Sequence, residues 1–294
     1  MVPLKKAMEM MEIPQDGLIP VTRVSQALDI LTRLGETATV MAGGTWVMRE
    51  ARDRTFVSLA NIPDLTDITL DDQTLVAGSM VTHQDLCDAI TGAPDLAALA
   101  TAAGTSATPA IRRMATLGGN LCTRDFYSAD LAPALLALNA EVDLQTSSGR
   151  ETLSLEDYLN TPVDRPHILL RVTVPRTAAR SAHVRLMQRQ AGDYPLAVVS
   201  LSAVITPDGA LRDLRIAVGS VEKRTRRWRA LEALCEGQKM TSDSIRAHAA
   251  LRAPQDFVGR DAVDGQGWYR LRVLPALVAR AFSDMSRTGQ GAGR

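Results

Sequence analysis

The sequence has little of what marks several common classes of protein. Its three cysteines, Cys87, Cys122 and Cys235, are isolated, with no C-x-x-C spacing that would suggest zinc or a protein-bound iron–sulfur cluster. Basic and acidic residues balance at 33 each, which gives no electrostatic reason to expect a nucleic-acid partner. We therefore expect reduced thiols in a cytoplasmic protein that holds no metal of its own.

Long apolar runs are also missing. No stretch approaches the roughly 20 apolar residues that a helix needs to cross a bilayer, and the first residues carry no secretion signal. There is no G-x-G-x-x-G between a strand and a helix and no G-x-x-x-x-G-K-[ST], so a Rossmann or P-loop nucleotide pocket is not expected. The one basic cluster, residues 223–229, predicts a solvated face or a subunit contact. The four histidines show no metal spacing.

Two pairs of glycines are the most informative feature that is present. One lies in residues 42–45 (AGGT) and the other in residues 116–120 (TLGGN), and each follows a short apolar stretch. Paired glycines allow positive φ and leave no Cβ to block a ligand. Successive N–H groups in such turns form a concave anion site. Two turns of this kind predict that the pyrophosphate of a dinucleotide cofactor is held from both sides.

At these residues the chain resembles the flavin-binding subunit of the molybdenum hydroxylases, the xanthine dehydrogenase and carbon monoxide dehydrogenase family. The family reads A-G-G-[HT] early and T-[IL]-G-G-N later, and residues 111–112, 128–138, 192–194 and 269–270 also match. The resemblance implies one FAD bound non-covalently, with electrons relayed from iron–sulfur clusters to an external acceptor. It also implies a small partner subunit with [2Fe-2S] clusters and a large partner subunit with molybdopterin.

The resemblance and the glycine pairs together define the residues expected to bind the cofactor. These are Ala42, Gly43, Gly44, Thr45, Trp46, Thr116, Leu117, Gly118, Gly119, Asn120, Asp130, Arg185 and Tyr194. The resemblance places Tyr194 on the isoalloxazine ring. It places the cation of Arg185, where relatives usually have lysine, near the flavin N1–O2 edge. Trp46 is a second departure from the family.

Simpler roles for several of these residues remain open. Asn120 has the side chain of a helix or turn cap. Asp130 begins an apolar helix, where its carboxylate meets the helix dipole favourably, although the resemblance adds a hydrogen bond to FAD. Tyr194 also suits the edge of a core, and Arg185 a solvated strand.

The fold class we predict is α+β. An FAD-binding domain of two α/β subdomains is expected over residues 1–177. A smaller domain with a three-stranded antiparallel sheet and helices is expected over 178–288, followed by a flexible tail at 289–294. The flavin would lie between the two subdomains, with its ring facing the smaller domain.

Hydrophobic periodicity and capping residues place the individual elements. Helices are predicted at 21–35 (stopped by Gly35), 82–90 (capped by Thr82), 94–103, 130–138, 226–235, 241–251 and 268–285. Strands are predicted at 39–42, 56–59, 74–77, 141–145, 168–174, 184–189, 196–206 and 211–218, with a turn at 207–209.

Two other functions remain open. A self-contained FAD oxidoreductase would need its own base near the ring, for which Asp193 is the only candidate. A flavin-free structural subunit is the other alternative, suggested by the departures at Trp46 and Arg185. The sequence does not identify the substrate, nor whether the acceptor is NAD, oxygen, a quinone or a carrier protein.

Overall fold

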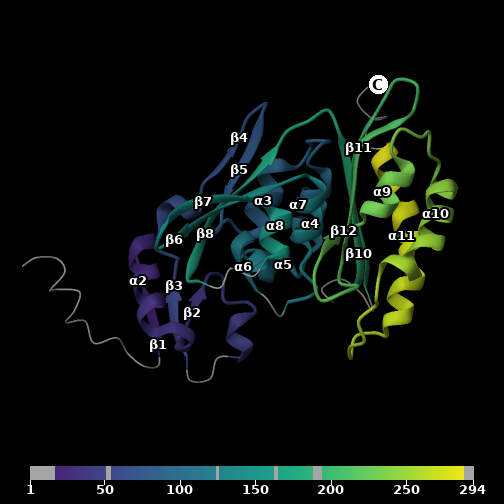
Figure 1. The fold of residues 1–294 in the computed structure, drawn as a ribbon. Coiled ribbons are helices and arrows are strands. Elements are labelled where there is room, and N and C mark those ends of the chain that lie inside the picture. The colour runs from purple at the N-terminus through teal and green to yellow at the C-terminus, as the bar shows by residue number, and fades with distance from the viewer. Residues whose placement is uncertain (1–16, 51–53, 124–125, 162–164, 188–193, 288–294) are drawn as a thin grey trace, which may run out of the picture.

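The computed structural model confirms an α+β fold built on three sheets (Figure 1). It describes residues 17–50, 54–123, 126–161, 165–187 and 194–287. From left to right in Figure 1, a small parallel sheet is followed by a layer of helices beneath a larger sheet, and then by a second antiparallel sheet with helices on its outer side. The expected tail at 289–294 lies outside the described residues.

The N-terminal unit is a three-stranded parallel sheet in the order β1 (Gly17–Pro20), β3 (Thr55–Ser58), β2 (Ala38–Met41). Helix α2 (Val24–Leu34) packs its apolar stripe into the core of this unit. Gly35 ends the helix as predicted, with φ of 55° and its N–H bonded to a carbonyl of the last turn. The short 3₁₀ turns along this part of the chain are η1 (Gly35–Thr37), η2 (Val47–Glu50) and η3 (Pro63–Leu65).

The second sheet is antiparallel throughout. Its strands, in spatial order, are β4 (Ile68–Leu70), β5 (Thr74–Gly78), β8 (His167–Pro175), β6 (Glu141–Thr146) and β7 (Gly149–Ser154). The helices of this unit are α3 (His83–Ile90), α4 (Ala97–Thr105), α5 (Pro109–Arg112), α6 (Leu117–Cys122), α7 (Leu131–Ala137) and α8 (Leu155–Asn160). Thr82 caps α3 as predicted, by accepting the N–H of Asp85.

The third sheet runs β12 (Arg226–Arg227), β11 (Leu211–Gly219), β10 (Pro195–Ile205), β9 (Arg180–Met187), all antiparallel. Helices α4 and α7 cover one face of it. The other face carries α9 (Arg229–Cys235) and α11 (Gly267–Arg287), with α10 (Ser242–Asp256) packed on α11. The long strand β10 is consequently buried over most of its length. Thus the central helices share a boundary with the C-terminal sheet.

Several predicted elements differ at their start, by three residues for the helices expected at 21–35, 94–103 and 226–235 and by four for the strand expected at 184–189. The helix expected over 226–235 begins only at Arg229, because residues 226–227 pair with β11 and the N–H of Trp228 donates to the carbonyl of Ile216. The Trp228 indole is buried and donates to Asp256, which fixes this corner. Hydrophobic periodicity gave no sign of strands β1, β4 and β7 or of helices α5, α6 and α8, which are short elements of three to six residues.

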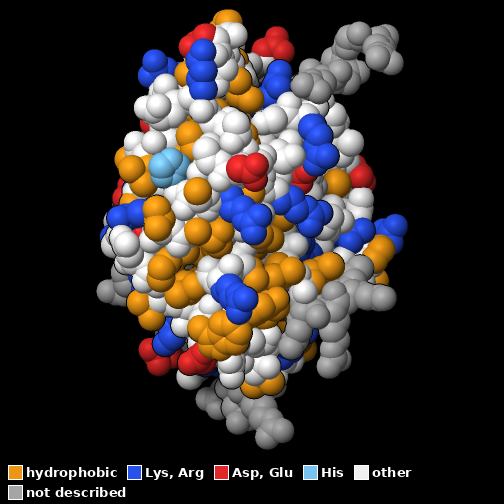
Figure 2. All heavy atoms as spheres, turned by 90° about the vertical axis from the view of Figure 1, so that its right-hand side faces the viewer, with side chains coloured by type: hydrophobic (Ala, Val, Ile, Leu, Met, Phe, Trp, Pro, Cys, Tyr) orange, Lys and Arg blue, Asp and Glu red, His pale blue; other side chains and the backbone are white. Residues whose placement is uncertain are grey.

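The face formed by α9, α10 and α11 is shown in Figure 2, where apolar side chains gather on its lower half. The large hydrophobic residues exposed in this part of the chain are Leu234, Leu251, Val258, Val263, Trp268 and Tyr269. Among the helices that the structure describes, none has the length and apolar character needed to span a bilayer.

Candidate functional site: a glycine-lined cleft

A cleft of about 1120 Å³ lies where the three units meet. The N-terminal unit contributes the segment after β2, the central unit contributes α6 and its neighbours, and the C-terminal sheet contributes Tyr194 and residues 223–225. Of the residues expected to bind the cofactor, all but two line this cleft. The exceptions are Leu117, which is buried in the central core, and Arg185, which lies behind the wall.

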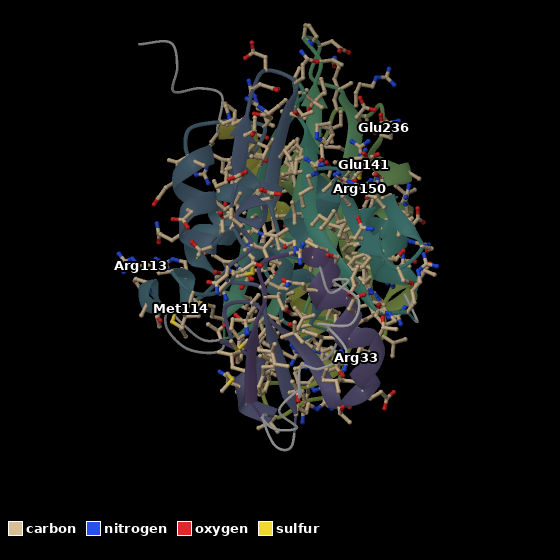
Figure 3. The ribbon with its side chains drawn as sticks, turned by 90° about the vertical axis from the view of Figure 1, so that its left-hand side faces the viewer. Arg33, Arg113, Met114, Glu141, Arg150 and Glu236 are labelled. Carbon is tan, nitrogen blue, oxygen red and sulfur yellow. The ribbon has the colours of Figure 1, made fainter. Side chains whose placement is uncertain are left out.

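The first glycine pair meets two different requirements. A Cβ on Gly43 would overlap the backbone carbonyl of Met114, so the two backbones are in direct contact. The Met114 side chain itself projects into solvent and is 58% exposed (Figure 3). A Cβ on Gly44 would make only ordinary van der Waals contacts, the nearest at 3.5 Å from Met48, but the residue adopts φ of +70°, which L-residues rarely take. Position 43 therefore requires glycine because of close backbone packing, and position 44 favours glycine because of its backbone conformation.

The amides of the first turn are available to a ligand. In the described part of the chain, none of the N–H groups of Gly43, Gly44, Thr45 and Trp46 donates to a protein acceptor. All four residues line the cleft. Unpaired backbone donors that converge on a concave surface form an anion site. This turn therefore meets the requirement for holding phosphate oxygens.

The second glycine pair is not a turn, which corrects the expectation from the sequence. Residues 117–122 form helix α6, Thr116 is its N-cap, and neither Gly118 nor Gly119 has positive φ. A Cβ on Gly118 would stand 2.8 Å from the Cβ of Ser79. Gly118 is thus required by the close approach of the segment that follows β5.

The N–H groups of this second segment are already bonded within the protein. Their acceptors are Val81 O for Leu117 (2.9 Å), Ser79 O for Gly118 (2.7 Å), Thr116 Oγ1 for Gly119 (3.1 Å) and Thr116 O for Asn120 (3.0 Å). In this conformation the two glycine pairs are therefore not equivalent, because only the first offers donors to an anion. The second forms the facing wall of the cleft.

Asn120 acts as a cap, one of the two roles left open by the sequence. Its Oδ1 accepts the N–H of Leu131 at 3.1 Å, the first residue of α7. Asp130, which precedes that helix, makes no side-chain cap. The side chain of Asn120 thus joins α6 to α7, and that of Asp130 is left for other contacts.

Asp130 lies in a buried charged cluster at the boundary with β9. Its Oδ1 is 3.3 Å from Nε of Arg185 and 3.9 Å from Nε2 of His183. Arg185 also donates to the carbonyl of Thr105, and Nδ1 of His183 is 2.8 Å from the hydroxyl of Ser200. Burial raises the pKa of Asp130 to about 7, although the Arg185 guanidinium opposes that rise. Burial, and then the Arg185 charge, lower the pKa of His183 to about 3. Arg185 is therefore a partner of Asp130 and not a solvated strand residue.

Aromatic rings from three parts of the chain meet in the cleft. The ring centroids are 4.7 Å apart for Trp46 and Phe126, 5.5 Å for Phe126 and Tyr194, and 5.9 Å for Trp46 and Tyr194. The guanidinium of Arg49 lies 4.9 Å from the Trp46 ring. These rings form a surface against which a planar ring can pack. Trp46 joins this group through its indole, a role that the sequence did not predict.

Sequence reasoning assigned no role to other residues of the cleft wall. Ser79 and His83 are both buried, and the Ser79 hydroxyl has no hydrogen-bond partner among the described residues. Nδ1 of His83 is 2.7 Å from the Ser106 hydroxyl, and burial lowers the pKa of His83 to about 4. Their place in and just after the loop that joins β5 to α3 was the available signal, since loops often carry site residues.

The basic cluster at 223–229 is in part the expected solvated face, because Lys223, Arg224 and Arg229 are exposed, but its arginines also form ion pairs within the protein. Arg226 pairs with Glu222, Arg227 with Glu232 and Arg229 with Glu156. Lys223 and Arg224 line the cleft. Residues 192 and 193, including the candidate base Asp193, lie outside the described residues.

These features fit a cofactor that carries both a diphosphate and a planar ring. Residues 43–46, whose amides have no acceptor among the described residues, line the cleft together with Ser79, whose hydroxyl has no hydrogen-bond partner there, and Trp46, Phe126 and Tyr194 provide ring surfaces. The fold and site thus define a protein that binds a dinucleotide cofactor.

Comparison with known families is consistent with that class. Residues 14–177 match the model of the FAD binding domain in molybdopterin dehydrogenase. Residues 182–285 match that of the CO dehydrogenase flavoprotein C-terminal domain. The chain belongs to the FAD-binding subunits of the molybdenum hydroxylase family, which are flavoprotein components of oxidoreductases.

Individual relatives extend over nearly the whole chain. The chain is 28% identical to the 6-hydroxypseudooxynicotine dehydrogenase complex subunit alpha of Paenarthrobacter nicotinovorans, over 93% of this chain and 95% of that protein. It is 25% identical to the carbon monoxide dehydrogenase medium chain of Hydrogenophaga pseudoflava, over 88% and 93%. The solved carbon monoxide dehydrogenase of that organism superposes with a TM-score of 0.85 at 24% identity, covering 95% of this chain and 99% of that chain. This last likeness supports the fold.

Proposed function

We infer that this chain holds one FAD in the glycine-lined cleft and passes electrons from the iron–sulfur clusters of a partner subunit to an external acceptor. The observation that carries the proposal is the set of unpaired amides at residues 43–46, facing a cleft of about 1120 Å³. Because the chain belongs to an FAD-binding family, we propose that the ligand of this anion site is the pyrophosphate of FAD. FAD, when bound, supplies the redox chemistry, and the protein binds and orients it.

The roles proposed for the residues follow from their positions. The amides of Gly43, Gly44, Thr45 and Trp46 would hold the pyrophosphate, and Ala42 leads into their turn. Residues 116–120 would form the wall that faces it. Tyr194 would pack on the flavin ring. Asp130 would hydrogen-bond to the cofactor, and Arg185 would supply positive charge from behind Asp130.

The proposed partners follow from how the relatives are named. One is called a subunit alpha of a dehydrogenase complex, and others are called medium chains. We propose that this chain likewise assembles with a small iron–sulfur subunit and a large molybdopterin subunit. The substrate would then be selected in the large subunit, and this chain would serve the acceptor.

Reconstitution tests the relay. The purified chain is loaded with FAD and mixed with candidate aldehydes or N-heterocycles, first alone and then with the small and large subunits. Flavin reduction by substrate is expected only when both partners are present. Direct bleaching of the isolated flavoprotein would contradict the relay and favour a self-contained oxidoreductase. Failure of the folded chain and its complex to take up FAD would favour a structural subunit.

A further inference from the structure

Three segments of the C-terminal unit reach the cleft, and no single element carries them all. Tyr194 immediately precedes β10, and residues 223–225 follow β11. The third segment acts through Arg260, whose guanidinium lies 5.5 Å from the ring of Tyr127, another residue of the cleft wall. These three segments can form one wall of the cleft only if contacts elsewhere in the C-terminal unit fix their positions relative to one another.

Arg270 on α11 connects all three segments. Its side chain is fully buried and does not line the cleft. It donates to Leu196 O at 2.5 Å, Ser220 O at 3.2 Å, Arg260 O at 3.0 Å, Gly265 O at 3.5 Å and Asp264 Oδ1 at 2.6 Å. Leu196 is two residues after Tyr194, and Ser220 is three residues before Lys223. A planar guanidinium can satisfy so many acceptors at once, which a lysine ammonium cannot.

The backbone at Ser220 is an independent sign of constraint. Ser220 is buried with φ of +65°, an uncommon conformation for a residue with a side chain. Its carbonyl accepts from both Arg270 and Arg260, the latter at 2.9 Å. Such conformations persist where surrounding contacts determine them, and they are common near functional sites. The two arginines thus fix the direction in which residues 221–225 leave the sheet toward the cleft.

We propose that Arg270 is a positioning residue for the flavin site. It sets the relative placement of Tyr194, residues 223–225 and, through Arg260, Tyr127, without touching the cofactor itself. The proposal rests on the proposed function of the cleft. Burying an arginine is costly, and packing alone would be met by an apolar side chain. Its five acceptors instead lie on the segments that lead to the cleft.

The test compares Arg270→Lys with Arg272→Lys, an exposed position on the same helix. Hydrogen exchange is measured on the FAD-free protein, followed by the visible spectrum and Kd for added FAD. Arg270→Lys should speed exchange in peptides covering 194–200 and 220–225 and leave residues 74–90 unchanged. It should also alter the flavin spectrum and raise Kd about tenfold, by analogy with the loss of affinity when a residue that supports a metal ligand is replaced. Arg272→Lys should behave as wild type.

A purely structural role would lower the unfolding midpoint but leave the spectrum and Kd of the folded variant unchanged, and this result would overturn the proposal. If Arg270→Lys does not fold, Arg260→Met and Asp264→Asn decide the question, since each removes part of the same network near the surface. Unaltered FAD affinity and spectrum in both would also overturn it. Failure of the wild-type chain to bind FAD would instead refute the proposed function, and would remove the ligand that Arg270 is proposed to serve.

Discussion

Gly43 and Met114 touch through their backbones, although they belong to different units of the molecule. A Cβ on Gly43 would overlap the Met114 carbonyl. This contact brings the turn after β2 against the residues that lead into α6, and so brings the two glycine pairs to opposite walls of one cleft. The two walls can therefore approach this closely only because Gly43 has no Cβ.

Substitutions in the first glycine pair should separate packing from conformation. Gly43→Ala is expected to lower the free energy of unfolding by about 3 kcal/mol or more and to abolish FAD retention, because the walls must move apart. Gly44→Ala makes no close contact and should cost only about 1–2 kcal/mol for its left-handed backbone. Urea unfolding and flavin content after purification measure both. Equal losses in the two variants would refute this division of roles.

The proposed ring contact of Tyr194 can be tested by truncation. Tyr194→Ala should shift the visible spectrum of bound FAD and weaken binding by about 0.5–1.5 kcal/mol beyond lost burial. Tyr194→Phe keeps the ring and serves as the control, with a near wild-type spectrum. Titration of the refolded apoprotein with FAD gives both quantities. An unchanged spectrum in Tyr194→Ala would mean that the ring lies elsewhere.

The stability of the protein should fall in acid because of His83. Its pKa is about 4 in the folded protein, below the ordinary value of 6.5. The unfolded chain therefore binds the proton first, and the stabilisation is present above pH 6.5 and lost as the pH falls through 4. The loss is on the order of 3 kcal/mol over that range. Replacing His83 by Gln should flatten this part of the profile of unfolding free energy against pH.

Asp130 contributes to the pH dependence of the unfolding free energy with the opposite sign, over an overlapping range of pH. Its pKa is raised to about 7 in the folded protein, so its contribution is present below the ordinary value of 3.8 and lost as the pH rises through 7. The His83 effect is therefore read from the difference between wild type and variant at each pH. A profile with the same slope in both proteins would contradict the assignment to His83.

The Asp130–Arg185 pair should behave as a coupled unit. Because Asp130 is ionised in the folded protein mainly above pH 7, Asp130→Asn leaves the Arg185 guanidinium without a carboxylate only there, and we expect a loss of about 3–5 kcal/mol in unfolding free energy above pH 7. Adding Arg185→Met should cost less than the sum of the single changes. Arg185→Met alone is also expected to lower the flavin reduction potential. Additive losses in the thermodynamic cycle would show that the pair is not coupled, and an unchanged potential would remove Arg185 from the cofactor site.

The sequence was most informative where a local pattern determines a local structure. The stop at Gly35 and the cap at Thr82 depend on nearby backbone groups, and both are observed. The three main strands of the C-terminal sheet were visible because each buries a run of apolar residues. The domain limits at 177 and 178 remain a prediction.

The rest of the site depends on distant contacts that no local pattern contains. Gly118 and Gly119 suggested a turn, but the hydroxyl of Thr116 and the carbonyls of Ser79 and Val81 draw this segment into a short helix. In the same way, the Asp130 carboxylate, expected to meet the dipole of the helix that it begins, faces Arg185, and Asn120 provides the cap. These outcomes follow from which segments become neighbours after folding.

The strand β10 lies between helices of both halves of the chain, with α4 and α7 on one side and α11 on the other. A chain cut after β8 would leave the apolar faces of α4 and α7 in water, and the remaining half would expose the other face of its sheet. Each half has a buried cluster of its own, but each would expose apolar surface that the intact chain buries. The two halves are therefore expected to unfold together in one cooperative transition. A substitution that destabilises the C-terminal half would then also unfold the cofactor-binding half.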